Sequence, residues 1–283
     1  MRVSLLKVSF GHGPALLQDH LRRLTCCAAT KLFGRALVVA TCSLLMLAGT
    51  EAQAADVSAA VAANFTAPAK EIADKFKAQT GQTVDLSFGA SGQLYTQISQ
   101  GAPFDIFLSA DSERAKKAET DGYAVPGTRF TYAIGKLVLW SADPALVDKD
   151  GAVLKKNSFA HIAIANPKAA PYGAAAVKAM NALGVYDVLE SKLVTGENIN
   201  QAFQFVASGN AELGFVALSQ VIDQKKGSSW LVPDNLYSPI VQDGVLLKQG
   251  ENNGAAKAFY TFLKGPEALK IIQRYGYALP SGK

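Results

Sequence analysis

The chain has no cysteine and almost no histidine over most of its length. Its three cysteines, Cys26, Cys27 and Cys42, all lie in the first 54 of 283 residues, and His161 is the one histidine beyond them. The other 283 − 54 = 229 residues therefore hold no disulfide, no thiolate metal site and no histidine-rich metal centre. A segment of this size can bury a sizeable core without such cross-links.

Excess positive charge is also missing from most of the chain. The formal charge is +5, but residues 1–54 hold six lysines and arginines against two carboxylates, 6 − 2 = +4. The rest of the chain is left with 5 − 4 = +1. Such a segment does not provide the basic surface that binds nucleic acid. We expect no nucleic-acid partner.

The positive charge belongs to a recognisable N-terminal signal. Residues 36–50 form an uncharged apolar run after Lys31 and Arg35, and Glu-Ala-Gln-Ala follows at 51–54. A basic segment, an apolar core and an A-x-A site are typical of a secretory signal peptide. A membrane-spanning helix needs roughly 20 apolar residues, more than this run offers. We predict that residues 1–54 are a signal peptide and that the mature protein is periplasmic.

The remaining chain alternates short apolar runs with segments of helical period, which is the pattern of strands joined by crossover helices. The first series predicts strands at residues 57–62, 83–88 and 104–108. Helices follow them, the first with Thr66 as its N-cap, the second after Ser91 and the third opened near Asp111. The second predicts strands at residues 161–165 and 213–217 and helices at 173–183 and 199–208. Two helices, at residues 254–263 and 266–275, close the chain.

Two long extended stretches, residues 130–140 and 239–248, separate these series. They predict an α/β fold of two lobes, each a mainly parallel sheet flanked by helices. We place the first lobe at residues 55–138 and 238–283 and the second at residues 139–237. A cleft between two lobes is a common place for a small ligand.

Catalytic motifs are scarce. The chain has no Walker loop, no complete G-x-G-x-x-G and no acidic cluster for a divalent cation. Ser91 lies in a turn that resembles the G-x-S-x-G nucleophile elbow, but the last glycine is replaced by Gln93, and a triad would have to use His161. Asp105 and Asp111 fit a turn and a helix N-cap better than an acid–base pair. We therefore predict a protein that is not an enzyme, with a secreted serine hydrolase as an alternative.

Four loops instead share another property. Each opens a predicted helix with small or neutral polar residues, and none contains a lysine or arginine; they are residues 63–66, 90–92, 171–173 and 198–200. Helix N-termini present unpaired backbone N–H groups and the positive end of the helix dipole. Four of them that converge would bind an anion without a basic side chain. Taken singly, each loop is better explained as an ordinary helix cap.

A family resemblance joins the four loops. The sequence resembles the periplasmic molybdate-binding proteins of ABC transporters, in order from about residue 56 to the end. The resemblance rests on residues 63–68 (ANFTAP), 87–92 (SFGASG), 101–111 (GAPFDIFLSAD), 130–141 (FTYAIGKLVLWS), 166–173 (NPKAAPYG), 213–220 (LGFVALSQ) and 263–268 (LKGPEA).

The resemblance implies a type II periplasmic-binding-protein fold, whose lobes close on molybdate or tungstate and deliver it to an ABC permease. It implies a monomer with no cofactor and no direct protein–metal ligand, since the metal is bound as the oxyanion. Carried onto this chain, it places ligand contacts at the side chains of Asn64 and Ser91 and at the backbone N–H groups of Tyr172 and Ile199.

Two positions depart from part of the family. Some relatives have a donor tyrosine where this chain has Ala217, and some have threonine where it has Ala63. The preference between molybdate and tungstate is therefore left open. A binding protein for another oxyanion, such as sulfate or phosphate, or for an organic carboxylate is a further alternative.

Overall fold

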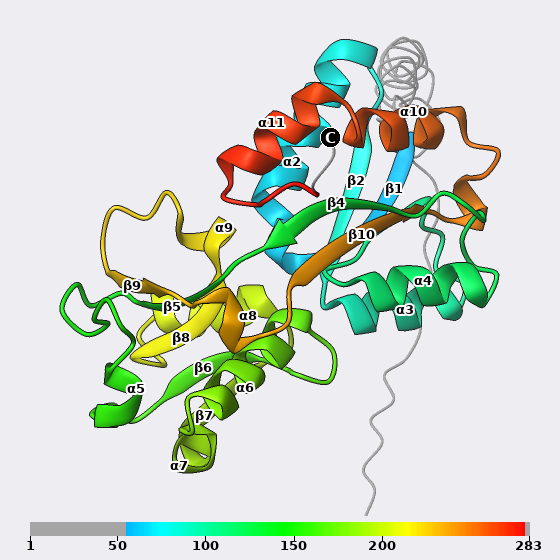
Figure 1. Ribbon diagram of the computed structural model, residues 1–283. Helices are drawn as coiled ribbons and strands as arrows, with labels where there is room; N and C mark the ends of the chain where they lie inside the picture. Colours follow the sequence, from blue (N-terminus) through cyan, green and yellow to red (C-terminus); the bar gives the residue numbers. More distant parts are fainter. Residues whose placement is uncertain (1–54, 281–283) are drawn as a thin grey trace, which may run out of the picture. The chain divides into compact units, whose positions relative to one another are not determined.

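The structure is a computed structural model that describes residues 55–280. The predicted signal peptide lies outside the described residues. Among those described, no helix is both long and apolar enough to cross a membrane. The described residues form one compact unit with two β-sheets (Figure 1).

The first sheet has five strands in the order β2-β1-β3-β10-β4. They are β1 (Val57–Ala62), β2 (Val84–Gly89), β3 (Ile106–Leu108), β4 (Phe130–Gly135) and β10 (Ile240–Leu246). β1 pairs in parallel with β2 and β3, whereas β10 pairs antiparallel with β3 and β4. The N-terminal strands therefore share a sheet with a strand from near the end of the chain.

Helices cover both faces of this sheet, because the side chains of β1 alternate between two apolar clusters. Val57, Ala59 and Val61 join one cluster, and Ala60 joins the other. The first lies under α2 (Thr66–Thr80), α10 (Gly254–Leu263) and α11 (Pro266–Arg274), and the second under α3 (Ser91–Ser99) and α4 (Ser112–Thr120) (Figure 1). A 3₁₀ turn, η1 (Ala63–Phe65), joins β1 to α2.

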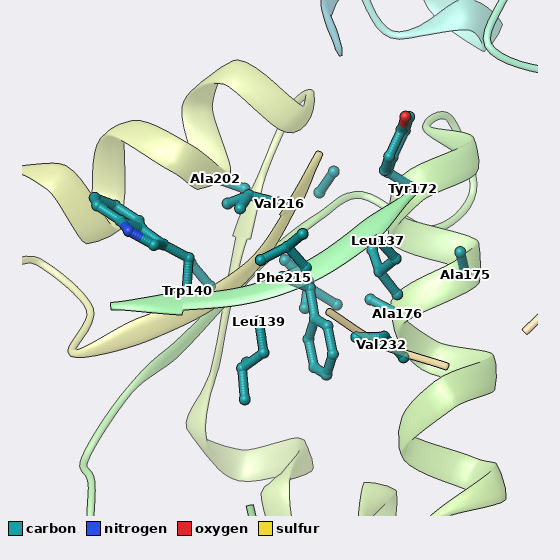
Figure 2. Packing of buried hydrophobic residues seen from close by; sticks show 14 of the residues in the cluster. Leu137, Leu139, Trp140, Tyr172, Ala175, Ala176, Ala202, Phe215, Val216 and Val232 are labelled. Atoms are coloured by element: carbon teal, nitrogen blue, oxygen red, sulfur yellow. The ribbon is translucent and has the colours of Figure 1, made fainter. Parts of the chain in front are cut away.

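The second sheet also has five strands, in the order β7-β6-β8-β5-β9. They are β5 (Leu137–Ser141), β6 (Ile162–Ala165), β7 (Leu193–Gly196), β8 (Leu213–Ala217) and β9 (Ser228–Leu231). β6 pairs in parallel with β7 and β8, and β5 pairs antiparallel with β8 and β9. Figure 2 shows Leu137, Leu139 and Phe215 of this sheet packed in the apolar core near α6.

The helices of the second lobe are α5 (Val153–Lys156), α6 (Pro171–Ala182), α7 (Tyr186–Leu189), α8 (Ile199–Ala207) and α9 (Leu218–Val221). Three further 3₁₀ turns are η2 (Glu190–Lys192), η3 (Asp234–Leu236) and η4 (Lys248–Gly250). The chain passes from the first sheet to the second at Lys136, between β4 and β5, and has returned to the first sheet at Ile240.

The predicted α/β fold with two lobes is confirmed, but the prediction of mainly parallel sheets is wrong. Each sheet is mixed, with two parallel and two antiparallel strand pairs. The reason is that the strands next to the crossings, β4, β5 and β10, each take part in antiparallel pairs. The predicted N-cap at Thr66 is also wrong, because Phe65 occupies that position and the Thr66 hydroxyl donates to the Ala63 carbonyl instead.

Candidate anion-binding site

Four loop-to-helix junctions line one cavity. They are the ends of β1 and β2 with the turns that follow them, and the starts of α6 and α8. All four residues that the sequence singled out lie in its wall and are almost fully buried, with exposed fractions of 3% for Asn64, 1% for Ser91, 2% for Tyr172 and 4% for Ile199. The cavity has a volume of ≈ 10 Å³, about one water-sized sphere, so a larger ligand requires the walls to part.

Among the described residues, the starts of α6 and α8 leave backbone N–H groups unpaired. In α8, the Asn198 side chain caps the N–H groups of Asn200 (3.0 Å) and Gln201 (3.2 Å) but not that of Ile199. In α6, Pro171 has no N–H, so that of Tyr172 is the first donor of the helix. Within residues 55–280, the backbone N–H groups of Ser91, Tyr172 and Ile199 have no hydrogen-bond partner. Unpaired N–H groups at buried helix ends are normally hydrogen bonded to a ligand or to water.

Ser91 adds a side-chain donor. Its Oγ accepts a hydrogen bond from the backbone N–H of Ala110 at 2.9 Å. That bond occupies a lone pair and leaves the hydroxyl proton, for which the described part of the chain supplies no acceptor. Ser91 therefore has both an N–H and an O–H to offer at the wall of the cavity.

Asn64 is arranged differently from the expectation. Its Nδ2 donates to Gln242 Oε1 at 2.8 Å and to Tyr277 Oη at 2.9 Å. An amide nitrogen has two protons, so both are already used. In this arrangement the Asn64 side chain has no N–H left for an anion, and its backbone N–H is the group it can contribute.

The lining of the cavity carries no charged side chain. Besides the four residues above it consists of Ala62, Ala63, Gly89, Ala90, Ala110, Ala170, Pro171 and Asn198. Tyr172 is the one titratable residue among them, and burial raises its pKa well above the ordinary value, which keeps it neutral. Any positive potential therefore comes from backbone dipoles at the starts of α3, α6 and α8.

The alternative catalytic groups have other partners. Ser91 bonds to Ala110, whereas His161 has its Nδ1 3.9 Å from Glu212 and a side chain that is 57% exposed. Asp111 caps α4 by accepting from the Arg114 N–H at 2.8 Å, and Asp105 accepts from the Ser58 N–H at 2.8 Å. The described residues contain no cluster of three or more histidine, cysteine or acidic residues that could hold a metal ion.

The two departures from the resembled family lie in different places. Ala63 is in the cavity wall, whereas Ala217 ends β8 and does not line the cavity. The buried polar residues behind the wall, which include Gln242, Ser219, Tyr132 and Tyr277, had not been predicted from the sequence. Gln242 could have been noticed as a polar residue within the apolar stretch at residues 239–248.

The chain is similar to known solute-binding proteins. The family described as bacterial extracellular solute-binding protein matches residues 57–278. The molybdate-binding protein ModA of Rhodobacter capsulatus is 63% identical over 235 residues, 83% of this chain and 93% of that protein. ModA of Azotobacter vinelandii is 58% identical over 231 residues, 81% of this chain and 92% of that protein.

A solved structure shows the same fold. The periplasmic molybdate-binding protein of Azotobacter vinelandii superimposes with a TM-score of 0.77 at 45% sequence identity, over 80% of this chain and 100% of that one. The chain therefore belongs to the bacterial extracellular solute-binding proteins, and among them to the family of molybdate-binding proteins.

Proposed function

We propose that this protein binds molybdate, and also tungstate, in the cavity and delivers it to an ABC permease for import. The observation that carries the proposal is the set of unpaired donors, the N–H groups of Ser91, Tyr172 and Ile199, around a buried cavity without a charged side chain. Buried donors without partners are costly unless a ligand accepts from them. An oxyanion supplies only acceptors and fits such a wall.

The contacts would be made by Asn64, Ser91, Tyr172 and Ile199. In our proposal Ser91 donates from its hydroxyl and its backbone, and the other three donate from backbone N–H groups. An isoleucine is compatible with this role because its side chain is not needed. The arrangement favours a fully ionised oxyanion, because a proton on the anion would need an acceptor in the wall. Molybdenum enters as cargo, so the protein needs no cofactor.

Capture would require the two lobes to move. We assign residues 55–138 and 238–283 to one lobe and residues 139–237 to the other. Hydrogen bonds between these segments hold the arrangement seen here: Gly92 N to Ala169 O at 2.9 Å, and Asn200 Nδ2 to Thr66 Oγ1 at 3.0 Å. Since the four contact residues are buried, the ion would enter while such bonds are open, as in hinge closure.

Membership of this family supports a proposal about where the protein acts and with which partners. We propose a periplasmic protein that is exported by the signal peptide at residues 1–54 and acts as a monomer. It would present the bound ion to the permease subunits at the inner membrane. In this role it binds and releases its ligand without chemical turnover, and it has no nucleic-acid partner.

A panel of oxyanions tests the ligand. Molybdate and tungstate have the same charge and shape, so each is expected to raise the melting temperature. At 100 times Kd the added stability is about 2.7 kcal/mol. Sulfate and phosphate at the same concentrations serve as controls with smaller shifts. If sulfate or phosphate stabilises the protein while molybdate and tungstate do not, the proposed identity of the ligand is wrong. Hydrolysis of ester substrates by the wild type but not by Ser91→Ala would instead support the hydrolase.

A further inference from the structure

A buried amide lies behind the cavity, outside the set of proposed contact residues. Gln242 is 0% exposed and belongs to β10, next to the point where the chain returns to the first sheet. The register of β10 against β4 shifts between Gln242 and Asp243. An amide in such a place is costly unless its groups are hydrogen bonded.

The hydrogen bonds of Gln242 reach both lobes. Its Oε1 accepts from Asn64 Nδ2 at 2.8 Å, and its Nε2 donates to Tyr172 Oη at 3.2 Å. Asn64 lies in the turn after β1, and Tyr172 lies in the first turn of α6. One side chain thus joins the side chains of two residues whose backbones line the cavity from opposite lobes.

A ring of hydrogen bonds holds the same turn from a second direction. Asn64 Nδ2 donates to Tyr277 Oη at 2.9 Å, Tyr277 Oη lies 3.0 Å from Ser219 Oγ, and Ser219 Oγ lies 2.8 Å from the Asn64 carbonyl oxygen. If each hydroxyl donates to the next group, every proton in the ring is used once. Ser219 belongs to α9, so this ring too connects the turn after β1 to the second lobe.

The crossing between β4 and β5 is shaped around this contact. A Cβ atom at Gly135 would lie 2.1 Å from Tyr172 Oη and 2.6 Å from Gln242 Nε2. Both distances are far below van der Waals contact, so only glycine leaves room for the Tyr172–Gln242 hydrogen bond. Both connections between the lobes, through Gly135 and through β10, therefore touch the Tyr172 hydroxyl.

We propose that Gln242 is a positioning residue for anion binding. It holds the turn that carries Asn64 and the start of α6 in the relative placement in which their backbone N–H groups face one ion. This inference rests on the proposed anion site. The Gln242–Asn64 bond lies within the first lobe and fixes the turn after β1, whereas the Gln242–Tyr172 bond forms only when the two lobes are together, so it opposes opening of the loaded protein and slows release of the ion.

The test is a set of rate constants for molybdate with Gln242→Met. The methionine side chain has a length similar to that of glutamine and carries no N–H or C=O group. We expect affinity to fall about tenfold to a hundredfold, because the hydrogen bonds of the Gln242 side chain are lost and their buried partners are left unpaired. Most of the loss should appear as faster dissociation, with association changed by less than about threefold.

Ser141→Ala is the matched control for a general loss of stability. Ser141 is also 0% exposed, its hydroxyl donates to the backbone carbonyl of Glu212, and it lies at the far end of β5 from Leu137. Figure 2 shows Trp140 at that end of the strand and Tyr172 near the other. The control is expected to lower the melting temperature without molybdate while it leaves the dissociation rate unchanged.

Tyr172→Phe provides the second measurement and serves alone if Gln242→Met does not fold. It removes only the hydroxyl and keeps the backbone N–H at the cavity. We expect about threefold to tenfold faster dissociation for Tyr172→Phe, and for the double variant less than the product of the single effects. If wild type binds molybdate and both single variants release it at the wild-type rate, the inference is wrong. If wild type does not bind molybdate at all, the proposed function fails instead.

Discussion

Two buried polar regions lie side by side in this protein, and they differ in whether their hydrogen-bond donors have partners within it. In the cavity wall, the N–H groups of Ser91, Tyr172 and Ile199 have no partner among the described residues. Behind it, the Gln242 cluster pairs its side chains with one another; it consists of Asn64, Tyr132, Tyr172, Ser219, Gln242 and Tyr277. Unpaired buried donors indicate a place for a ligand, whereas donors that are paired within the protein indicate support for it.

Asn64 and Tyr172 belong to both regions. Each lines the cavity and is hydrogen bonded through its side chain within the Gln242 cluster. Within residues 55–280, the one buried side-chain atom without a partner is Asn157 Oδ1, which lies in neither region. The side chain of such a residue is held in place by hydrogen bonds in the Gln242 cluster, and its backbone N–H remains available to an anion. A neutral residue can therefore donate to an anion and stay fixed.

The largest effect should come from placing a negative charge in the cavity. Ser91→Asp puts a carboxylate at the start of α3, where the helix dipole favours it. The same carboxylate would repel the dianion, and one such pair of unit charges at 4 Å costs about 4 kcal/mol near a protein surface. We expect molybdate affinity to fall by about a thousandfold or more, while the melting temperature without ligand does not fall.

Titration calorimetry and thermal denaturation measure these two quantities separately. The combination of lost binding and retained stability would show that the donors at Ser91 serve a ligand. Retained binding would mean that the anion does not approach Ser91, and the contrast between the two regions would lose its basis.

A smaller effect is expected when the hydroxyl is removed without added charge. Ser91→Ala deletes one donor to the anion and leaves the Ala110 N–H without its acceptor. A hydrogen bond to a charged group contributes about 1.5–3 kcal/mol, so molybdate affinity should fall about tenfold to a hundredfold. Ser99→Ala is the matched control, because Ser99 is on the same helix but only half-buried, and its hydroxyl donates to the Thr96 carbonyl. Equal affinities of the two variants in calorimetry would contradict the role of Ser91.

The local part of this picture could be predicted from the sequence. β1, β8 and α10 have the predicted limits, since their apolar patterns and the residues that bound them lie within one short window. The four loops of the cavity were also predicted, because Pro171 and Asn198 are signals for a helix start. β7 and β9 were not, since four residues each take strand form by pairing with β6 and β5.

The Gln242 cluster could not be predicted in this way. Gln242 is separated from Asn64 by 178 residues and from Tyr172 by 70. No periodicity or cap signal relates such positions, and only the fold brings them together. The same distance explains why the Asn64 amide is taken for a free donor until its partners on β10 and at Tyr277 are known.

The smallest effect is expected from a change of pH, which should leave ligand binding at the cavity unchanged and alter stability through the buried tyrosines. Tyr172 is the one titratable residue in the cavity wall, and burial raises its pKa, so it stays neutral well above pH 7. Molybdate is already a dianion at neutral pH. We therefore expect the Kd to change by less than about twofold between pH 7 and pH 9.

Stability should respond at higher pH, through the buried tyrosines. Burial raises the pKa values of Tyr132, Tyr172 and Tyr277, and raises that of Tyr237 to about 12. Because the folded pKa exceeds the unfolded value of about 10, this stability is complete below pH 10 and is lost as pH rises toward the folded values. Denaturation from pH 8 to pH 11 measures the loss. A tenfold change of Kd between pH 7 and pH 9 would instead reveal a titrating group facing the anion, which neutral donors alone cannot produce.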